Sequence, residues 1–228
     1  MHLFQTENLK ELEKYELYLS TPIGELKFYV KIGNQLVNQH LPEHVYSFLD
    51  NGRIAIWSTA NDLLEFLQLT VLPNLPSNMY VEKCVIAMWR VKKISDFNQH
   101  SMNFECRWKS IPYAQNYPDT GQGLEAQCWK TSEHTLMIGT EDIELLKGRA
   151  YRNENFPKRF EELLDKSNSY GISYLTDGLS MTLPSLLRDE VAQVHFVVAW
   201  TKTKDQDTST WFAVDIPSQE ILRLAHCH

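Results

Sequence analysis

Residues 194–201 read VHFVVAWT, and residues 210–216 read TWFAVDI, with the polar stretch KTKDQDTS between them. Both segments are short and rich in β-branched and aromatic residues, and a polar loop between two such segments is typical of a β-hairpin. In a symmetric hairpin, Trp200 would lie opposite Trp211. Apolar side chains fall on both faces of the pair, so we expect other parts of the protein to cover both faces.

Alternation of apolar and polar residues predicts strands elsewhere in the chain. Every second side chain is apolar in residues 24–33, GELKFYVKIG, and again in residues 102–110, MNFECRWKS. Residues 53–58, RIAIWS, also predict a strand. Residues 80–94, YVEKCVIAMWRVKKI, are apolar enough on both faces for a central strand, with a helix as the alternative. Residues 172–183 predict one or two short strands.

Helices are predicted from capping residues and from apolar spacing near 3.6 residues. The predicted helices are a first one capped by Thr6, and then residues 42–50, 61–69, 141–147, 153–167 and 183–193. Residues 111–123, IPYAQNYPDTGQG, predict a long polar loop instead.

Together these elements predict an α+β fold that is mainly antiparallel. We expect a strongly twisted or barrel-like sheet with several packed helices. The 228 residues fit a single domain over 1–228, and the two prolines of residues 72–78, LPNLPSN, mark an internal break as the alternative.

Composition narrows the class of protein. The hydrophobic fraction of 43% and the charged fraction of 22% are ordinary for a soluble globular chain. A net charge of −7 argues against extensive nucleic-acid binding, which normally requires a basic face. The sequence has neither a signal-peptide pattern at its start nor an apolar run that could span a membrane. The four cysteines form no Cys-x-x-Cys pair, so we expect reduced thiols and a cytoplasmic location.

Two similar boxes, CRWKS at residues 106–110 and CWKTS at residues 128–132, raise the question of a metal site or a disulfide. Zinc ligands usually include a local pair of cysteines, and none is present. Cys106 falls on the apolar face of its strand, where a free thiol behaves as a small hydrophobic group. We therefore predict two sheet segments joined by a long loop, with no metal and no cofactor.

Six basic residues fall on the predicted middle strands: Arg90, Lys92, Lys93, Arg107, Lys109 and Lys130. If these strands are neighbours, their polar faces would form a basic patch that is either a solvated sheet face or a docking site for an anion or a protein.

Two functions from different classes fit the sequence, which contains neither a nucleophile elbow nor a glycine-rich phosphate loop. The first is a soluble, non-enzymatic binding protein that docks or neutralises a protein partner through an aromatic-rich sheet surface, with the acidic field attracting a basic partner. The second is a small-molecule enzyme or ligand carrier with an aromatic-lined pocket inside the sheet. The candidate binding residues are Arg107, Trp108, Tyr174, His195, Trp200, Trp211 and Asp215.

Overall fold

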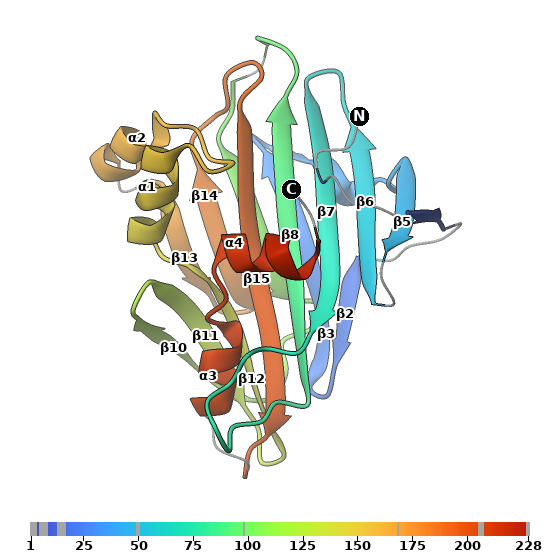
Figure 1. Cartoon of the computed structure of the whole chain (residues 1–228), viewed down its shortest axis with the longest axis vertical. Coiled ribbons are helices and arrows are strands. Elements are labelled where there is room, and N and C mark those ends of the chain that lie inside the picture. The colour runs from blue at the N-terminus through green and yellow to red at the C-terminus, as the bar shows by residue number, and fades with distance from the viewer. Residues whose placement is uncertain are drawn as a thin grey trace.

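The structure is a computed structural model that describes residues 4, 9–12, 17–48, 51–97, 99–167, 169–204 and 208–226. Within these residues, antiparallel strands form two open sheets that pack face to face (Figure 1). One sheet has nine strands in the order β1-β5-β6-β7-β8-β15-β12-β11-β10, and the other has six, in the order β13-β14-β9-β3-β2 with β4 paired to β3.

The strands of the nine-stranded sheet are β1 (Lys10–Glu11), β5 (His44–Phe48), β6 (Gly52–Ser58), β7 (Asp62–Val71), β8 (Lys83–Lys93), β15 (Val191–Lys202), β12 (His134–Glu141), β11 (Leu124–Lys130) and β10 (Gln115–Gly121). Those of the six-stranded sheet are β13 (Gly171–Leu175), β14 (Gly178–Leu183), β9 (Met102–Trp108), β3 (Gly24–Ile32), β2 (Tyr18–Thr21) and β4 (Gln35–Leu36). The helices of the described residues are α1 (Ile143–Arg152), α2 (Phe160–Lys166), α3 (Thr208–Val214), α4 (Ser218–Leu224) and the short 3-10 helix η1 (Val37–Gln39).

The main core fills the space between the two sheets, and aromatic side chains dominate it. Phe28 of β3 contacts Phe66 of β7 with ring centroids 5.4 Å apart, and Trp108 of β9 meets Trp129 of β11 edge-on at 5.6 Å. Each such pair contributes about 0.5–1.5 kcal/mol beyond the burial of its surface. These contacts join sheets whose strands are far apart in sequence.

A second core lies on the outer face of the nine-stranded sheet. Helices α3 and α4 cover this face, with α4 crossing in front of β15 and β8 and α3 lying over β12 (Figure 1). Helices α1 and α2 instead lie beside β13 and β14, and their apolar residues join the core between the sheets. The nine-stranded sheet is therefore buried on both faces, which explains why its central strands are apolar throughout.

The structure confirms most of the predicted strands and the mainly antiparallel class. The alternation in residues 24–33 and 102–110 corresponds to β3 and β9, whose apolar side chains face the core. Residues 53–58 lie in β6, residues 80–94 contain β8, and residues 172–183 contain the hairpin of β13 and β14. Closure into a barrel is not found, because both sheets have two open edges within the described residues.

The hairpin predicted from residues 194–201 and 210–216 is wrong. Its first half is the central strand β15, which is covered on both faces as predicted but pairs with β8 and β12. Its second half is helix α3, so Trp200 lies beside Lys83 and Leu136 on the neighbouring strands and not opposite Trp211. Ala213 and Val214 of α3 are buried against the outer face of the sheet, and this packing overrides the strand preference of the segment.

Three predicted helices are also wrong. Residues 42–50 contain strand β5, residues 61–69 belong to strand β7, and residues 183–193 contain no helix. In residues 61–69 the apolar side chains cover both faces of a central strand, a pattern that periodicity alone does not distinguish from a buried helix. The helix expected after Thr6 falls largely outside the described residues, although residues 10–11 form strand β1.

The two remaining helix predictions have the right type but shifted bounds. Helix α1 starts after Asp142, whose side chain accepts a hydrogen bond from the backbone N–H of Leu145, and continues through Gly148 to a left-handed Asn153. Only the second half of residues 153–167 is helical, as α2. Residues 111–123, predicted as a loop, contain the edge strand β10.

The connection over residues 72–82 joins β7 to β8, which pair along their whole length. The predicted single domain over 1–228 stays a prediction.

Candidate functional site

The sequence-predicted binding residues lie in separate parts of the molecule. Trp108 and Trp200 are 4% and 6% exposed and pack into the core between the sheets. Trp211 lies on α3, on the opposite side of the nine-stranded sheet, and Asp215 follows that helix at the surface. The structure therefore does not bring the three tryptophans together in one pocket.

Arg107 and Tyr174 belong to two further places. Arg107 lies on the outer face of the six-stranded sheet, where its guanidinium donates to Asp177 at 2.7 and 2.9 Å and to Glu105 at 3.4 Å. Tyr174 of β13 donates its hydroxyl hydrogen to Glu125 of β11 and so connects the two sheets near their edges. Partial burial and the neighbouring Glu125 carboxylate raise the pKa of Tyr174.

His195 lies beneath α4 in a group of buried polar residues, which we call the buried polar cluster. Its Nδ1 lies 4.0 Å from a carboxylate oxygen of Glu141, and Arg149 donates to the same oxygen at 2.6 Å. The other oxygen of Glu141 accepts the backbone N–H of Ser218 at 3.0 Å, and Gln193 donates to the Ser218 hydroxyl at 2.6 Å. All five residues are buried, so this cluster fixes α1 and α4 to the sheet and is closed to ligands.

The pKa values of this cluster follow from burial and from the neighbouring charges. Burial lowers the pKa of His195, and the charge of Arg149 adds to the effect against the opposing charge of Glu141. For Glu141, burial alone would raise the pKa. The charges of Arg149 and His195 and the hydrogen bond from Ser218 outweigh this effect, so the pKa of Glu141 lies below its usual value.

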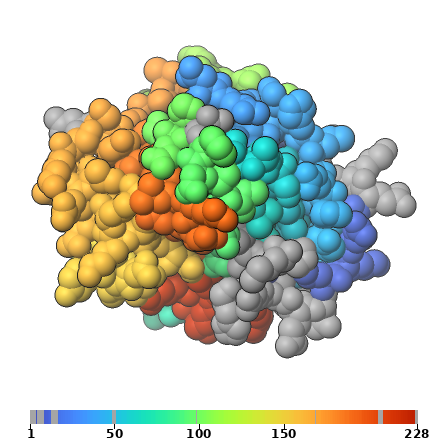
Figure 2. Space-filling view, turned by 90° about the horizontal axis from the view of Figure 1, so that it is seen from above, coloured from blue at the N-terminus to red at the C-terminus, as the bar shows by residue number. Residues whose placement is uncertain are grey.

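The candidate site is a pocket at one end of the sandwich, which we call the end pocket. It has a volume of about 860 Å³ and is partly open to solvent. Figure 2 looks onto this end, where segments that are far apart in the chain come together. The lining residues are Ile32, Gly33, Asn34, Gln35, Leu36, Val37, Gln39, Thr59, Ala60, Asn61, Asp62 and His100.

Backbone hydrogen bonds hold the walls of the end pocket in place. Gly33, in the turn between β3 and β4, donates to the carbonyl of Ser101 at 2.9 Å, and Ile94 donates to the carbonyl of Asn61 at 2.8 Å. Gly33 has a φ of +59°, and a Cβ there would lie only 3.0 Å from the His100 ring. Glycine therefore allows both the left-handed turn and the close packing of His100.

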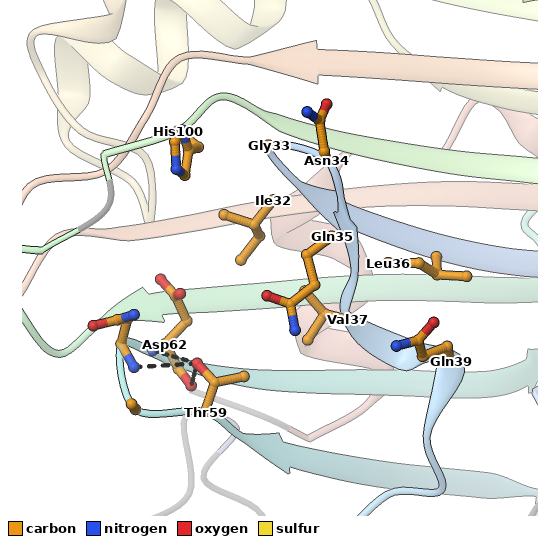
Figure 3. Close-up of a pocket in the computed structure, with 12 residues that line it drawn as sticks. Ile32, Gly33, Asn34, Gln35, Leu36, Val37, Gln39, Thr59, Asp62 and His100 are labelled. Carbon is orange, nitrogen blue, oxygen red and sulfur yellow. Dashed lines mark hydrogen bonds between the residues drawn. The ribbon is translucent and has the colours of Figure 1, made fainter.

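The turn between β6 and β7 forms the opposite wall (Figure 3). The Thr59 hydroxyl accepts the backbone N–H groups of Asn61 and Asp62 at 3.2 and 2.9 Å. For the helix predicted over residues 61–69, the sequence offers Thr59 or Asn61 as the N-cap. A threonine side chain can accept the same backbone N–H groups in a tight turn as at the start of a helix. The hydrogen bonding expected of a capping residue is therefore present at Thr59, but a strand follows it and not a helix.

A buried ion pair lies at the base of the end pocket. The Asp62 carboxylate is 3.2 Å from the ammonium group of Lys93, its partner on strand β8, and the two side chains are only 10% and 3% exposed. Burial raises the pKa of Asp62, against the opposing effects of Lys93 and His100. A carboxyl group with a raised pKa in a pocket is a recognised feature of functional sites.

The chemistry of the end pocket suits a small polar ligand without a net charge. Asn34, Gln35, Gln39 and Asn61 offer amide donors and acceptors, and the charge of Asp62 is balanced by Lys93. Figure 3 shows Gln35 and Ile32 between His100 on one side and Asp62 with Thr59 on the other, so polar and apolar contacts are both available.

Sequence reasoning did not single out the residues of the end pocket. They come from turns on both sheets, and no local spacing connects Asn34 or Gln35 with Asp62 or His100. The available signals were the glycine–asparagine turn at residues 33–34 and the Thr59 turn, which indicate structure and not binding.

The question of a metal site or a disulfide, which the two boxes raised, can be examined at the cysteines. Cys84, Cys106 and Cys128 are free and buried, and Cys106 and Cys128 belong to different sheets. The two boxes are thus sheet segments as predicted, although the segment between them contains β10. Residues 4–226, apart from their undescribed gaps, contain no group of three or more possible metal ligands. Across the described part of the chain, no helix combines the length and the apolar character needed to span a membrane.

The expected basic patch on the middle strands is not found as one surface. Strands β8 and β9 belong to different sheets, and Arg90 and Lys93 are buried at 3% and 2% exposure. Arg107 and Lys109 remain together on the outer face of the six-stranded sheet, where both form ion pairs.

Comparison with known proteins gives little beyond this description. No family model matches the chain, and no curated protein matches it. Among solved structures, the chain is similar to one described as a putative kojibiose phosphorylase from human microbiome, with 11% identity and a TM-score of 0.46. The match covers 87% of this chain but only 26% of the other, so the chain spans about a quarter of that protein's length.

Proposed function

We propose that this protein binds a small, polar, uncharged molecule in the end pocket. The observation that carries the proposal is the lining of a pocket of about 860 Å³ by four amide side chains around a charge-balanced Asp62–Lys93 pair. Ligand pockets commonly have volumes of 300–1,000 Å³ and a few convergent polar groups. Molecules with several hydroxyl or amide groups satisfy such a lining.

The geometry supports a ligand-binding role because the pocket walls are fixed before a ligand arrives. Both sheets contribute walls, and a backbone hydrogen bond within each sheet holds its wall: Gly33 donates to Ser101 beside β3 and β9, and Ile94 donates to Asn61 beside β7 and β8. A preformed site loses little conformational entropy on binding. The raised pKa of Asp62 also makes this carboxyl group the candidate for proton transfer if the bound molecule is a substrate.

The test is a thermal-shift screen with a library of neutral polyols, sugars, nucleosides and amides. A ligand present at 100 times its Kd stabilises the folded protein by about 2.7 kcal/mol. The fluorescence of Trp57 provides a second signal of binding. Its indole donates to the backbone carbonyl of His40 beside η1, and η1 lines the end pocket. Gln35→Ala should abolish the shift, whereas the control Gln219→Ala on α4 should preserve it. A library without hits, or equal shifts in both variants, would refute the proposal.

A second candidate function, docking of a protein partner through an aromatic-rich sheet surface, is favoured by the surroundings of β10. This strand is at the edge of the nine-stranded sheet within the described residues. Tyr113 is fully exposed, and Ile111 and Tyr117 are 59% and 39% exposed. An edge strand with exposed apolar side chains is a template for an added strand from a partner. The net charge of −7 would favour a basic partner, and we place this interaction in the cytoplasm.

Affinity capture from the native source tests this second candidate. A protein recovered with the unaltered chain should be lost with Ile111→Ser/Tyr113→Ser. It should be retained with the control Phe97→Ser, a residue that is 77% exposed elsewhere on the surface. Recovery of the same proteins with both variants would count against docking at β10.

A further inference from the structure

A second pocket lies on the other side of η1 from the end pocket, and we call it the cationic pocket. Its volume is about 400 Å³, and it is open to solvent on the outer face of the six-stranded sheet. Lys27 and Tyr29 of β3, Tyr18 of β2, His40 and Lys109 provide its charged and aromatic lining. Gln39 contacts both pockets, so η1 is the wall that separates them.

The charge of this pocket is opposite to that of the whole protein. Two lysines and a histidine line it, and no aspartate or glutamate does so among the described residues. Carboxylates do lie beside the pocket: Glu105 is directly opposite Tyr29 on β9, and Glu25 pairs with Lys109 at 2.7 Å while both side chains stay largely exposed. An exposed pair of this kind contributes little to stability.

Lys27 lies on the outer face of the six-stranded sheet beside a second cation, Arg107. Its direct neighbour across the sheet on β9 is Arg107, a residue of like charge, and its neighbour on β2 is Tyr18. Arg107 is neutralised by Asp177 and Glu105, whereas Lys27 forms no ion pair with a carboxylate of the described residues. Because Arg107 already has its carboxylate partners, an anion in the pocket would balance the charge of Lys27 without competing for that pair.

The wall made by η1 is fixed by specific hydrogen bonds. The side chain of Asn38 accepts the backbone N–H of Val30 at 3.1 Å and donates to the carbonyl of Phe28 at 2.8 Å, so it continues the ladder of β3 where β2 ends. On the other side, the indole of Trp57 donates to the carbonyl of His40 at 3.0 Å. The pocket is thus formed without a ligand.

We propose that the cationic pocket binds a small organic anion. Its carboxylate or phosphate group lies between Lys27 and Lys109, and an aromatic or aliphatic body packs against Tyr18 and Tyr29. Lysine ammonium groups bind such anions through charge-assisted hydrogen bonds, and tyrosine rings supply flat apolar surface. This site is distinct from the end pocket in both position and ligand charge, so either proposal can fail without the other.

The test is a two-dimensional NMR titration of the full chain with phenyl phosphate, phenylacetate and, as the uncharged counterpart, benzyl alcohol. At least one anion should shift the backbone amide signals of residues 27–29 and 38–40, and benzyl alcohol should not. Since a hydrogen bond to a charged group is lost, Lys27→Gln should weaken the binding about tenfold or more. Lys158→Gln, at an exposed lysine on another part of the surface, should leave the affinity unchanged.

Higher salt should also weaken the binding, because the pocket is open to screening ions. Three results would overturn the proposal: no shift at these amides with either anion at millimolar concentration, equal shifts with benzyl alcohol, or an unchanged affinity in Lys27→Gln. The spectrum of each variant reports at the same time whether it is folded.

Discussion

Replacement of Arg149 by methionine should strongly destabilise the fold by leaving a buried carboxylate without its main partner. The Arg149 guanidinium is 3% exposed and donates to Glu141 at 2.6 Å and to the backbone carbonyl of Gln193 at 2.9 Å. Methionine has a similar length and preserves apolar contact with Phe156, whose ring lies 5.1 Å from the guanidinium. The change therefore removes the charge and the hydrogen bonds with little loss of volume.

The expected magnitude follows from the burial of Glu141, which is 6% exposed. Removing one partner of a buried ion pair costs about 3–5 kcal/mol, a large part of the 5–15 kcal/mol that stabilises a typical domain. The double variant Glu141→Gln/Arg149→Met has no charge left to neutralise, and its side-chain amide can still accept the backbone N–H of Ser218. It should be more stable than Arg149→Met by about 1 kcal/mol or more.

The pH dependence of the stability loss in Arg149→Met provides an independent test. The charge of Arg149 helps to lower the pKa of His195, so its removal should raise that pKa. As the pH falls through the raised pKa, His195 gains a proton 4.0 Å from Glu141 and replaces the missing cation. The deficit of Arg149→Met relative to the unaltered protein should therefore shrink as the pH falls below the ordinary histidine pKa of 6.5.

Urea unfolding followed by tryptophan fluorescence measures these differences, with the free energy obtained by linear extrapolation. A loss below about 1 kcal/mol at pH 7 would show that the pair contributes far less than a buried ion pair should. A double variant no more stable than the single one, or a deficit that grows on acidification, would also refute the reasoning.

Three further predictions concern titration, backbone conformation and thiol access. Burial lowers the pKa of His195, so the unfolded chain binds a proton at this residue more readily than the folded protein does. The free energy of unfolding should therefore be highest above the ordinary histidine pKa of 6.5 and should decline as the pH falls below it. His195→Gln should remove this part of the pH dependence of unfolding. Gly33 has a positive φ, so Gly33→Ala should destabilise the fold by about 1–2 kcal/mol in urea unfolding. Gly148 lies inside α1, and Gly148→Ala should stabilise the fold by up to about 1 kcal/mol. A change of the same sign in both variants would contradict the conformational argument. Burial raises the pKa of the Cys106 thiol well above its usual range, and Cys84 and Cys128 are buried as well. In a Cys227→Ser variant, a thiol reagent should therefore label the protein only as fast as the protein unfolds. Prompt labelling in native buffer would contradict this burial.

The local pattern of the sequence was sufficient for many of the strands. In residues 24–33 and 102–110 a period of two residues places every apolar side chain on one face, and only a half-buried strand satisfies it. Residues 194–201 are apolar on both faces, which requires a covered central strand, and β15 is one. These inferences succeeded because the solvent distinguishes the faces of a strand residue by residue.

The sequence alone could not determine the elements whose identity depends on distant neighbours. Residues 61–69 are apolar on nearly every side, which suits a buried helix as well as a central strand, and pairing with β6 and β8 decides for the strand. Residues 210–216 have strand-forming residues, but α3 buries Ala213 and Val214 on a sheet face that only the complete fold creates. Helix and strand propensities differ by less than about 1 kcal/mol per residue, so the free energy gained by such packing outweighs them.

The two pockets were beyond local reasoning for the same reason. The end pocket combines turns from both sheets, and the cationic pocket combines β2, β3, η1 and Lys109. Composition and periodicity determined that this chain would form antiparallel sheet with buried aromatic side chains. The tertiary structure alone determined which polar side chains meet, because the distances between them depend on how the two sheets align and not on their spacing along the chain.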